Sequence, residues 1–452
     1  MKSTMVIGSC LRFFVVAALV VSSQANFPNE KLKTVFEWKD LEYGFPTEAD
    51  RQYALNERLY IPRNGIPIDV DVFYKGDGTA KTFVTIPRFS PGIPYSLATV
   101  SNRRGPNGPL LEAYPNYNMH SSNGTDCNGI TSIFRVAIDE CNRLWMVDTG
   151  RVDTTQHCPP KVLVYNLNND NLVLRYQIPE GQYFPGMSLF ITPIVDIPNG
   201  QCNRAKLYIA DVQAPGLLVF DQATQSSWRI QHKWMYPDPD FGTFTIAKES
   251  FNLMDGMFGM SLTPKSYNGE RYLYFHALAS EKESAVPLRA INDASMWAGN
   301  PEGHPEVFKN LGYRGVQCAA EAMDSRGNLY CCLMEPISIF SWNINTPYQK
   351  KFFKDVVTNP EKLQFASGMK VIKNRQGQEE LWVSTNRLQK IYAGSINYNE
   401  VNFRLLVGNV NELNGGVVGP SRPPFFPPTR RPSYGGGSGG YGQDLGNNLI
   451  FT

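Results

Sequence analysis

One arrangement of apolar and polar positions recurs along residues 26–411: an apolar strand, a polar turn, and a second strand that ends in aromatic residues. The clearest copy is IFRVAIDECNRLWMVD (133–148). Short apolar runs separated by Asp, Asn and Gly are typical of β-hairpins. Five further copies are recognisable, at residues 81–100, 192–211, 259–276, 319–333 and 367–384.

The spacing of the copies indicates radial repetition. Each copy carries an equivalent aromatic residue, and these residues recur at intervals of 52 to 66 positions: Phe83, Trp145, Tyr208, Tyr274, Tyr330 and Trp382. After several copies a further strand follows, and a four-stranded propeller blade needs about 40–45 residues. We therefore predict an all-β fold, a six-bladed β-propeller over residues 26–411 whose blades bury one another's apolar faces. A sandwich or two unrelated β domains is the alternative, but neither explains six copies.

A ring of blades needs a seal between its first and last members. The stretches KLKTVFEW (31–38) and VNFRLLVG (401–408) both have the composition of strands. We predict that the N-terminal strand joins the last blade beside residues 401–408, because closure removes the exposed edges of an open sheet.

Both ends of the chain differ from the repeated region. Residues 1–25 have the form of a secretory signal, with an apolar run at 13–21 and small residues in SQA (23–25) for cleavage. The run is about half the ~20 residues that a membrane-spanning helix needs, so we expect a secreted, extracellular protein without a membrane partner. Residues 412–452 are rich in Pro and Gly and predict a disordered tail, either merely solvated or adhering to an extracellular matrix.

Composition narrows the classes of partner. The 452 residues carry a formal net charge of +2, which gives no electrostatic reason to expect nucleic acid. Hydrophobic residues make up 42% and charged residues 19%, so the chain can bury a large core. Net charge and composition do not determine the oligomeric state.

Cysteine positions predict two disulfides. Seven cysteines follow the signal, so at least one is a free thiol or bonds to another chain. Cys141 and Cys202 occupy equivalent turns of consecutive hairpins, and we expect them to pair. Cys127 precedes the hairpin of the first turn and Cys158 follows it, so we expect that pair on the opposite face of the ring.

The remaining cysteines lie in one hairpin. If Asp324 pairs with Leu329, Cys331 and Cys332 face residues 322 and 321 rather than Cys318, and we expect no bond among these three. The five histidines lack metal-ligand spacing, so no metal site is predicted. Asn123 begins a glycosylation sequon, Asn-Gly-Thr.

Six motifs carry a family resemblance. In order along the chain, they resemble the insect yellow and major royal jelly protein family: DECNRLWMVDTG (139–150), CPPKVLVYNL (158–167), KESFNLMDGMFGMSLTP (248–264), SGMKV (367–371), TNRLQKI (385–391) and VNFRL (401–405). The resemblance implies a secreted six-bladed β-propeller. It implies one of several functions: dopachrome tautomerisation or decarboxylation in melanin synthesis, cuticle pigmentation without an accepted activity, binding of biogenic amines in the central pocket, or a nutrient role.

Three functional hypotheses follow. The protein is an enzyme that isomerises dopachrome-like compounds, a non-catalytic binder of catecholamines or other biogenic amines, or a structural propeller associated with cuticle matrix. The sequence does not decide whether it is an enzyme. It contains no G-x-S-x-G elbow, and no acidic and amide residues stand out as the metal set of a propeller lactonase. We expect no cofactor, and the expected partner is a small aromatic amine or aminochrome.

The resemblance and the residues together nominate a pocket. Asn386 and Leu388 match positions that line the amine pocket in salivary relatives. Phe258 and Phe134 are candidate pocket walls or, equally, blade-core residues. Two polar candidates are also turn candidates. Asp255 is a candidate base or amine anchor, or a turn residue before Gly256, and Ser367 is a candidate donor or a turn residue.

Overall fold

Six antiparallel sheets follow one another along the chain in the computed structural model, which describes residues 30–120, 124–266 and 269–415. The first three contain, from the ring axis outward, β3 (Asp69–Tyr74), β4 (Ala80–Thr85), β5 (Leu97–Arg104) and β6 (Pro109–Ala113); β7 (Ile133–Ile138), β8 (Arg143–Asp148), β11 (Lys161–Asn166) and β12 (Asn171–Gln177); and β13 (Phe190–Asp196), β14 (Lys206–Asp211), β15 (Gly216–Asp221) and β16 (Ser226–Ile230). The last three contain β19 (Met257–Leu262), β20 (Tyr272–Ala277), β21 (Lys282–Pro287) and β22 (Lys309–Tyr313); β23 (Cys318–Met323), β24 (Asn328–Leu333), β25 (Ser338–Asn343) and β26 (Lys354–Thr358); and β27 (Phe365–Lys373), β28 (Glu379–Asn386), β29 (Phe403–Asn409) and β1 (Lys33–Trp38).

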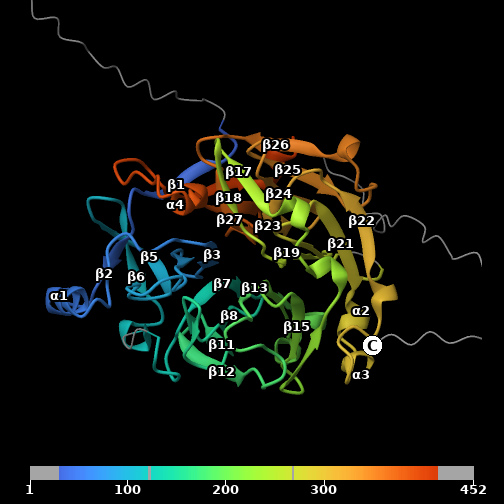
Figure 1. Cartoon of the computed structure of the whole chain (residues 1–452), viewed down its shortest axis with the longest axis horizontal. Helices are drawn as coiled ribbons and strands as arrows, with labels where there is room; N and C mark the ends of the chain where they lie inside the picture. Colours follow the sequence, from blue (N-terminus) through green and yellow to red (C-terminus); the bar gives the residue numbers. More distant parts are fainter. Residues whose placement is uncertain (1–29, 121–123, 267–268, 416–452) are drawn as a thin grey trace, which may run out of the picture.

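The sheets are arranged as the blades of a ring. The innermost strands β3, β7, β13, β19, β23 and β27 each contact the next, and β27 contacts β3. They surround the centre in Figure 1, with β12, β22 and β26 at the periphery. The predicted six-bladed β-propeller is therefore confirmed.

The N-terminal strand closes the ring, as predicted. β1 pairs antiparallel with β29, from Lys33 opposite Val407 to Trp38 opposite Phe403. The indole N–H of the buried Trp38 donates to the carbonyl of Pro109 in the first blade at 2.7 Å. The next strand, β2 (Glu42–Gly44), pairs in parallel with β6, so one short segment joins the last blade to the first.

Shorter elements complete the described chain. The α-helices are α1 (Glu48–Asn56), α2 (Leu288–Ile291), α3 (Ala294–Trp297), α4 (Leu388–Tyr392) and α5 (Val410–Leu413). There are also two small hairpins. β9 (Arg151–Val152) and β10 (Thr155–Gln156) lie between β8 and β11 of the second blade, and β17 (Thr243–Ile246) and β18 (Glu249–Asn252) connect the third blade to the fourth. None of the helices in the described ranges is both long and apolar enough to span a membrane.

Equivalent polar residues start the hairpin turns. Asp139 Oδ1 accepts the backbone N–H groups of Cys141 and Arg143 at 2.9 and 3.0 Å, and Asp324 Oδ1 does the same for Arg326 and Asn328, both at 2.9 Å. A short acceptor side chain thus satisfies turn donors that no strand can reach. These aspartates are structural, as their place in the repeated pattern suggests.

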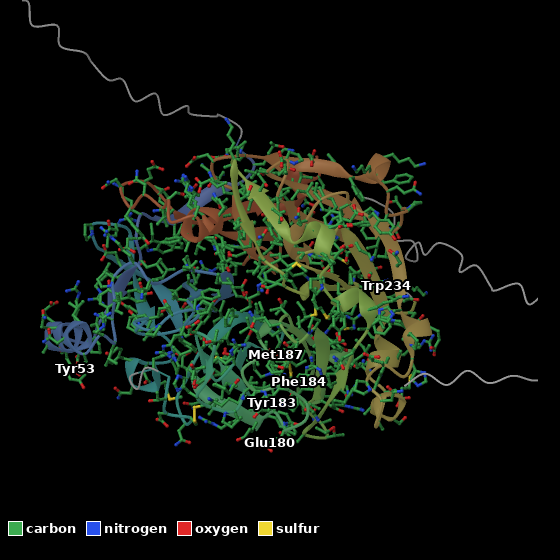
Figure 2. The ribbon with its side chains drawn as sticks, in the orientation of Figure 1. Tyr53, Glu180, Tyr183, Phe184, Met187 and Trp234 are labelled. Atoms are coloured by element: carbon green, nitrogen blue, oxygen red, sulfur yellow. A yellow bond between two sulfur atoms is a disulfide. The ribbon has the colours of Figure 1, made fainter. Side chains whose placement is uncertain are left out.

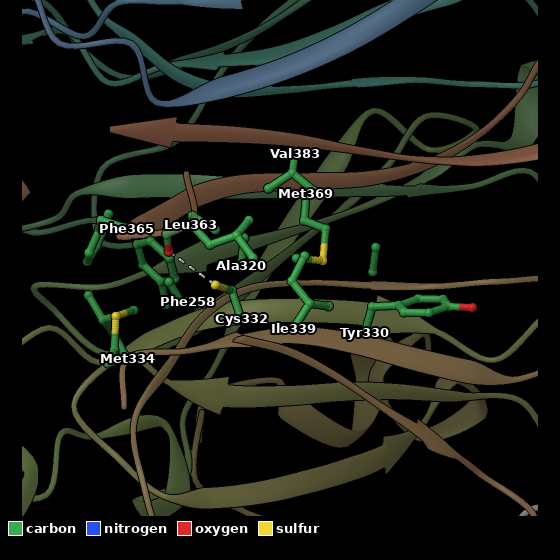
Figure 3. Packing of buried hydrophobic residues seen from close by; sticks show 14 of the residues in the cluster. Phe258, Ala320, Tyr330, Cys332, Met334, Ile339, Leu363, Phe365, Met369 and Val383 are labelled. Carbon is green, nitrogen blue, oxygen red and sulfur yellow. Dashed lines mark hydrogen bonds between the residues drawn. The ribbon is translucent and has the colours of Figure 1, made fainter. Parts of the chain in front are cut away.

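The aromatic residue of each copy is buried between blades. Phe83, Trp145, Tyr208, Tyr274 and Tyr330 are fully buried, and Trp382 is 6% exposed. Figure 3 shows one such region, in which Tyr330 lies in the same cluster as Ile339, Met369 and Val383. Burial of such rings supplies the apolar area that stabilises adjacent blades.

Three disulfides are present among the described cysteines. Cys127–Cys158 and Cys141–Cys202 are the two pairs expected from the sequence. The third, Cys318–Cys331, contradicts the expectation that no bond forms in that hairpin.

The error came from the strand register. Met323, not Asp324, is opposite Leu329, and a bulge between Cys318 and Glu321 shifts the pairing again. Cys318 is consequently opposite Leu333, which makes Cys331 its diagonal neighbour on the same face. The two Cα atoms are 6.1 Å apart.

Cys332 is the free thiol of the described chain and is fully buried. Its sulfur lies 3.7 Å from the carbonyl oxygen of Leu363, as Figure 3 shows. Burial raises the pKa of this thiol to about 12, which keeps it in the unreactive protonated form.

Several sequence predictions fall outside the described residues: the signal at 1–25, glycosylation of Asn123, and the tail beyond residue 415. Near the end of the described residues, α5 ends at Leu413, and that side chain is fully buried.

Candidate ligand-binding cavity

A cavity of about 530 Å³ opens at the end of the ring axis where the innermost strands begin. Phe134, Phe258 and Phe365 come from the first residues of β7, β19 and β27, and Ile68 directly precedes β3. Because every innermost strand starts at this face, side chains from different blades converge here. The volume lies in the range of small-molecule sites.

Five of the predicted pocket residues line this cavity: Phe134, Phe258, Ser367, Leu388 and Asp255. Phe134 meets Phe89 edge-to-face, with ring centroids 5.1 Å apart at 87°. Leu388 is the first residue of α4, which enters the cavity mouth. The phenylalanines are therefore both buried and cavity-lining, so the two readings of them are compatible.

Asn386 does not line the cavity. It is the last residue of β28 and is buried, and its amide nitrogen donates to the carbonyl of Pro67 and to the Ser367 hydroxyl oxygen, both at 3.1 Å. The Ser367 hydroxyl in turn donates to the carbonyl of Ile68 at 2.7 Å. Asn386 thus positions Ser367, and the hydroxyl proton of Ser367 is already engaged within the protein.

Asp255 brings an isolated carboxyl to the cavity. It precedes β19 and is buried, and the loss of hydration raises the pKa of its carboxyl to about 7. No hydrogen bond or ion pair reaches this carboxylate from elsewhere in the described chain. The adjoining Gly256 packs closely: a Cβ there would lie 2.6 Å from the carbonyl oxygen of Met235. The close packing fixes the segment that carries Asp255.

The buried guanidinium group of Arg135 packs against the ring of Phe258, one of the aromatic residues that line the cavity. The guanidinium carbon of Arg135 lies 4.2 Å from the ring centroid of Phe258. Arg135 Nη1 donates to the Thr192 hydroxyl at 2.8 Å, and Nη2 donates to the carbonyl of Ser367. A cation over one face of the ring fixes its orientation toward the cavity.

Two further arginines form part of the wall, and sequence reasoning missed both. Arg151 Nη1 donates to the carbonyls of Met187 and Ser188 and to Gln213 Oε1, each at 3.1 Å. Arg88 donates to five backbone carbonyls, including that of Ile93 at 2.9 Å. Their main partners are carbonyls, which leave no recognisable pattern in the sequence.

Helix α4 lines the cavity and packs against the β17–β18 hairpin. The rings of Tyr392 and Phe251 stack 4.9 Å apart at 12°. Glu249 accepts hydrogen bonds from Lys390 Nζ at 2.8 Å and from the Ser395 hydroxyl at 2.5 Å. Tyr392 is half-exposed, and burial together with the Asp255 charge raises the pKa of its hydroxyl, which therefore stays protonated.

A second polar cluster lies away from the cavity. His276 Nδ1 is 3.2 Å from Glu283 Oε2 and 3.1 Å from Glu321 Oε2, and all three side chains are fully buried. Its Nε2 faces the carbonyls of Cys318 and Ala319 at 3.1 and 3.0 Å. Both ring nitrogens thus face oxygen atoms, so the imidazole is held on both sides by groups of the protein.

Comparisons with known proteins identify the family of this chain. The sequence model of the family described as major royal jelly protein matches residues 131–418. The chain belongs to the major royal jelly protein family. Among curated members, it is 33% identical to the dopaminechrome tautomerase of Drosophila melanogaster, over 87% of this chain and 85% of that protein.

Other relatives within the family carry different names. The chain is 34% identical to major royal jelly protein 9 of Apis mellifera, over 86% of this chain and 90% of the relative. It is 31% identical to protein yellow of Drosophila yakuba, over 90% of this chain and 74% of the relative. The family match includes Asp255, Phe258 and α4, whereas Arg88 and Phe89 of the first blade lie before it.

Proposed function

We propose that this member of the major royal jelly protein family is a secreted enzyme that tautomerises an aminochrome in its central cavity and acts in melanin or cuticle pigmentation. The observation that carries the proposal is the isolated, buried Asp255 carboxyl among aromatic walls, with a pKa of about 7. A base is most effective when its pKa lies near the working pH. The relative named dopaminechrome tautomerase suggests the substrate class.

The cavity suits a flat bicyclic substrate. Phe134, Phe258 and Phe89 supply apolar surface, against which an indoline-quinone ring stacks favourably. Arg135 holds the ring of Phe258 in place from behind. The cavity is mostly apolar with few polar groups, as in sites that orient a ligand by one or two contacts.

The reaction needs one base and one acid. The Asp255 carboxylate takes a proton from the saturated ring carbon next to the iminium group, and the electron pair moves through the ring to a quinone oxygen. The Tyr392 hydroxyl, kept protonated, donates a proton to that oxygen. Proton exchange with solvent at the half-exposed Tyr392 and at the cavity mouth restores both groups. This transfer gives the 3H-indole tautomer of the product. Loss of a proton from the neighbouring saturated carbon to solvent, with protonation of the ring nitrogen, then completes the aromatic dihydroxyindole, which has the same atoms as the substrate.

Secretion is part of the proposal and is supported by two features. The predicted signal at 1–25 directs export, and the described chain holds three disulfides, which persist in oxidising compartments.

One observation favours a second candidate function. Because the Asp255 carboxylate has no cation partner among the described residues, it also suits a ligand ammonium group, as in a non-catalytic amine binder. The cuticle-matrix role proposed for the tail concerns residues beyond 415, and a tail-deleted protein that still localises to cuticle would rule it out.

Fresh dopaminechrome and dopachrome, mixed separately with purified protein, test the enzyme. We expect faster loss of aminochrome absorbance with formation of the dihydroxyindole. Asp255→Asn removes the base, whereas Asp153→Asn changes another carboxyl of the cavity wall and serves as the matched control. Calorimetric binding of dopamine with unchanged aminochrome decay would instead establish the binder.

A further inference from the structure

A second hollow lies on the outer side of the third and fourth blades and has no part in the proposed reaction. This outer groove has a volume of about 730 Å³, and its lining combines aromatic, proline and acidic side chains: His232, Trp234, Tyr236, Pro305, Glu302 and Glu306, with Gln231 and Lys233. Figure 2 shows Trp234 at the outer part of the ring, apart from Phe184 and Met187.

The aromatic wall of the outer groove is held in a fixed orientation. The His232 ring stacks on Phe308, with centroids 4.1 Å apart at 11°, and meets Trp234 at 75° with centroids 4.6 Å apart. His232 Nδ1 also accepts the backbone N–H of Trp234 at 3.3 Å. Burial and the neighbouring Lys233 lower the pKa of His232 to about 4, so the ring is neutral. The exposed Tyr236 continues this wall.

The facing side of the outer groove is acidic. Glu302 and Glu306 are both exposed, and hydrogen bonds from its own backbone and from His304 lower the pKa of Glu306. Lys233 is the cation of the lining, and its ammonium lies over the Trp234 ring at 5.9 Å. The two carboxylates exceed this single positive charge, so the groove favours a cationic ligand.

Grooves of this chemistry suit one kind of peptide. Proline-rich segments in the polyproline II conformation dock on surfaces lined by Trp, Tyr and Pro, because little conformational entropy remains to be lost. Arginines next to the prolines form charge-assisted hydrogen bonds with carboxylates at the edge.

The chain contains such a segment in its own tail. The sequence RPPFFPPTRRP (422–432) has five prolines, four of them in two adjacent pairs, and it has arginines at 422, 430 and 431. The described structure ends at residue 415, and the seven residues from there to Arg422 span up to about 22 Å at ~3.1 Å per residue. We propose that residues 422–432 dock in the outer groove of the same molecule, with prolines on Trp234 and arginines facing Glu302 and Glu306.

Docking would withdraw the tail's arginines from outside partners. The proposal is independent of the reaction in the central cavity, because none of the groove residues lines that cavity. Either proposal can therefore fail alone.

Limited trypsin digestion of the full-length protein tests the docking. Arg422 and Arg431 both precede proline and resist trypsin, so the Arg430–Arg431 bond reports on the segment. We expect Trp234→Ala to speed cleavage at this bond about tenfold, the change that loss of ~1.4 kcal/mol of binding produces. Phe184→Ala is the control, since it truncates an exposed ring outside the groove.

Charge reversal keeps the test valid if Trp234→Ala perturbs the fold. Glu302→Lys with Glu306→Lys changes exposed side chains only and should speed cleavage to a similar extent, as should high salt. Equal cleavage rates in the native protein and both groove variants would overturn the proposal. Protection that disappears on dilution would also overturn it, because the occupant would then be the tail of a second copy.

Discussion

Nδ1 of His276 lies 3.1 Å from Oε2 of Glu321, although both side chains are fully buried. Burial and Arg314 lower the pKa of this histidine, but Glu283 and Glu321 outweigh them and raise it to about 9. The cluster thus places a histidine cation between two blades, with Arg314 Nη1 2.7 Å from Glu283 Oε2 as the second cation.

This cluster makes stability sensitive to alkaline pH. A pKa of about 9 in the folded state, against ~6.5 when unfolded, stabilises the fold fully below pH ~6.5, and this contribution is lost as pH rises through 9. We expect the unfolding temperature to fall between pH 7 and 9.5. In His276→Gln the fall should be smaller, and the same fall in both proteins would contradict the assignment.

Asp255 should set the pH dependence of catalysis. Its carboxyl has a pKa of about 7, and the base acts when deprotonated, so kcat/KM should rise with pH to a plateau above 7. Asp255→Asn should lower kcat/KM by about 10²–10⁴-fold and flatten this profile. Asp153→Asn should keep both the rate and the profile; equal losses in the two variants would assign the effect to cavity charge rather than to a base.

The Tyr392 hydroxyl can be tested apart from its ring. Tyr392→Phe keeps the stack on Phe251 but removes the proposed acid, so we expect kcat to fall by about 10²-fold with an unchanged unfolding temperature. Tyr236→Phe, on an exposed tyrosine of the outer groove, is the control. Full activity of Tyr392→Phe would require another proton donor.

Closure of the ring depends on Trp38. Trp38→Ala removes a buried ring and its hydrogen bond to Pro109, and we expect a loss of about 3–5 kcal/mol in the free energy of unfolding. Val35 on the same strand is 40% exposed, so Val35→Ala should change stability little. Denaturant unfolding measures both, and similar small effects would show that β1 adds little to closure.

The thiol count tests the corrected disulfide pattern. Alkylation of the unfolded, unreduced protein without residues 1–25 should modify Cys332 alone, since the other six cysteines are bonded. Replacing Cys318 and Cys331 together by alanine should cost about 2–4 kcal/mol. Labelling of three cysteines would show instead that Cys318 and Cys331 are not bonded to each other.

Features that depend on repetition were predictable from the sequence. The recurring aromatic positions gave the blade number, and the shared turn positions of Cys141 and Cys202 gave their pairing. Cys318–Cys331 was missed because a bulge shifts the register, and no sequence pattern marks a bulge made by two alanines, Ala319 and Ala320. Local spacing specifies faces of a regular strand but not irregularities within it.

The sequence predicted the cavity-lining residues that belong to the innermost strands, but not those that lie in loops. Phe134 and Phe258 belong to repeated strands, so their convergence follows from the ring. Asn386 lies two residues from Leu388, yet it ends a strand while Leu388 begins a helix, and only the latter reaches the cavity. Arg88 and Arg151 bind backbone carbonyls, and such contacts depend on loop paths that composition does not reveal.

The pairing of Lys33 with Val407 has a consequence for synthesis. Chain growth releases the N-terminal strand first, but its partner strand emerges only after all the other blades. Until then β1 has no sheet to join, and the ring stays open with unpaired strand edges, which favour aggregation. Folding of this protein is therefore completed only after nearly the whole chain has been translated, and C-terminal truncations before residue 409 should accumulate as unclosed, aggregation-prone chains.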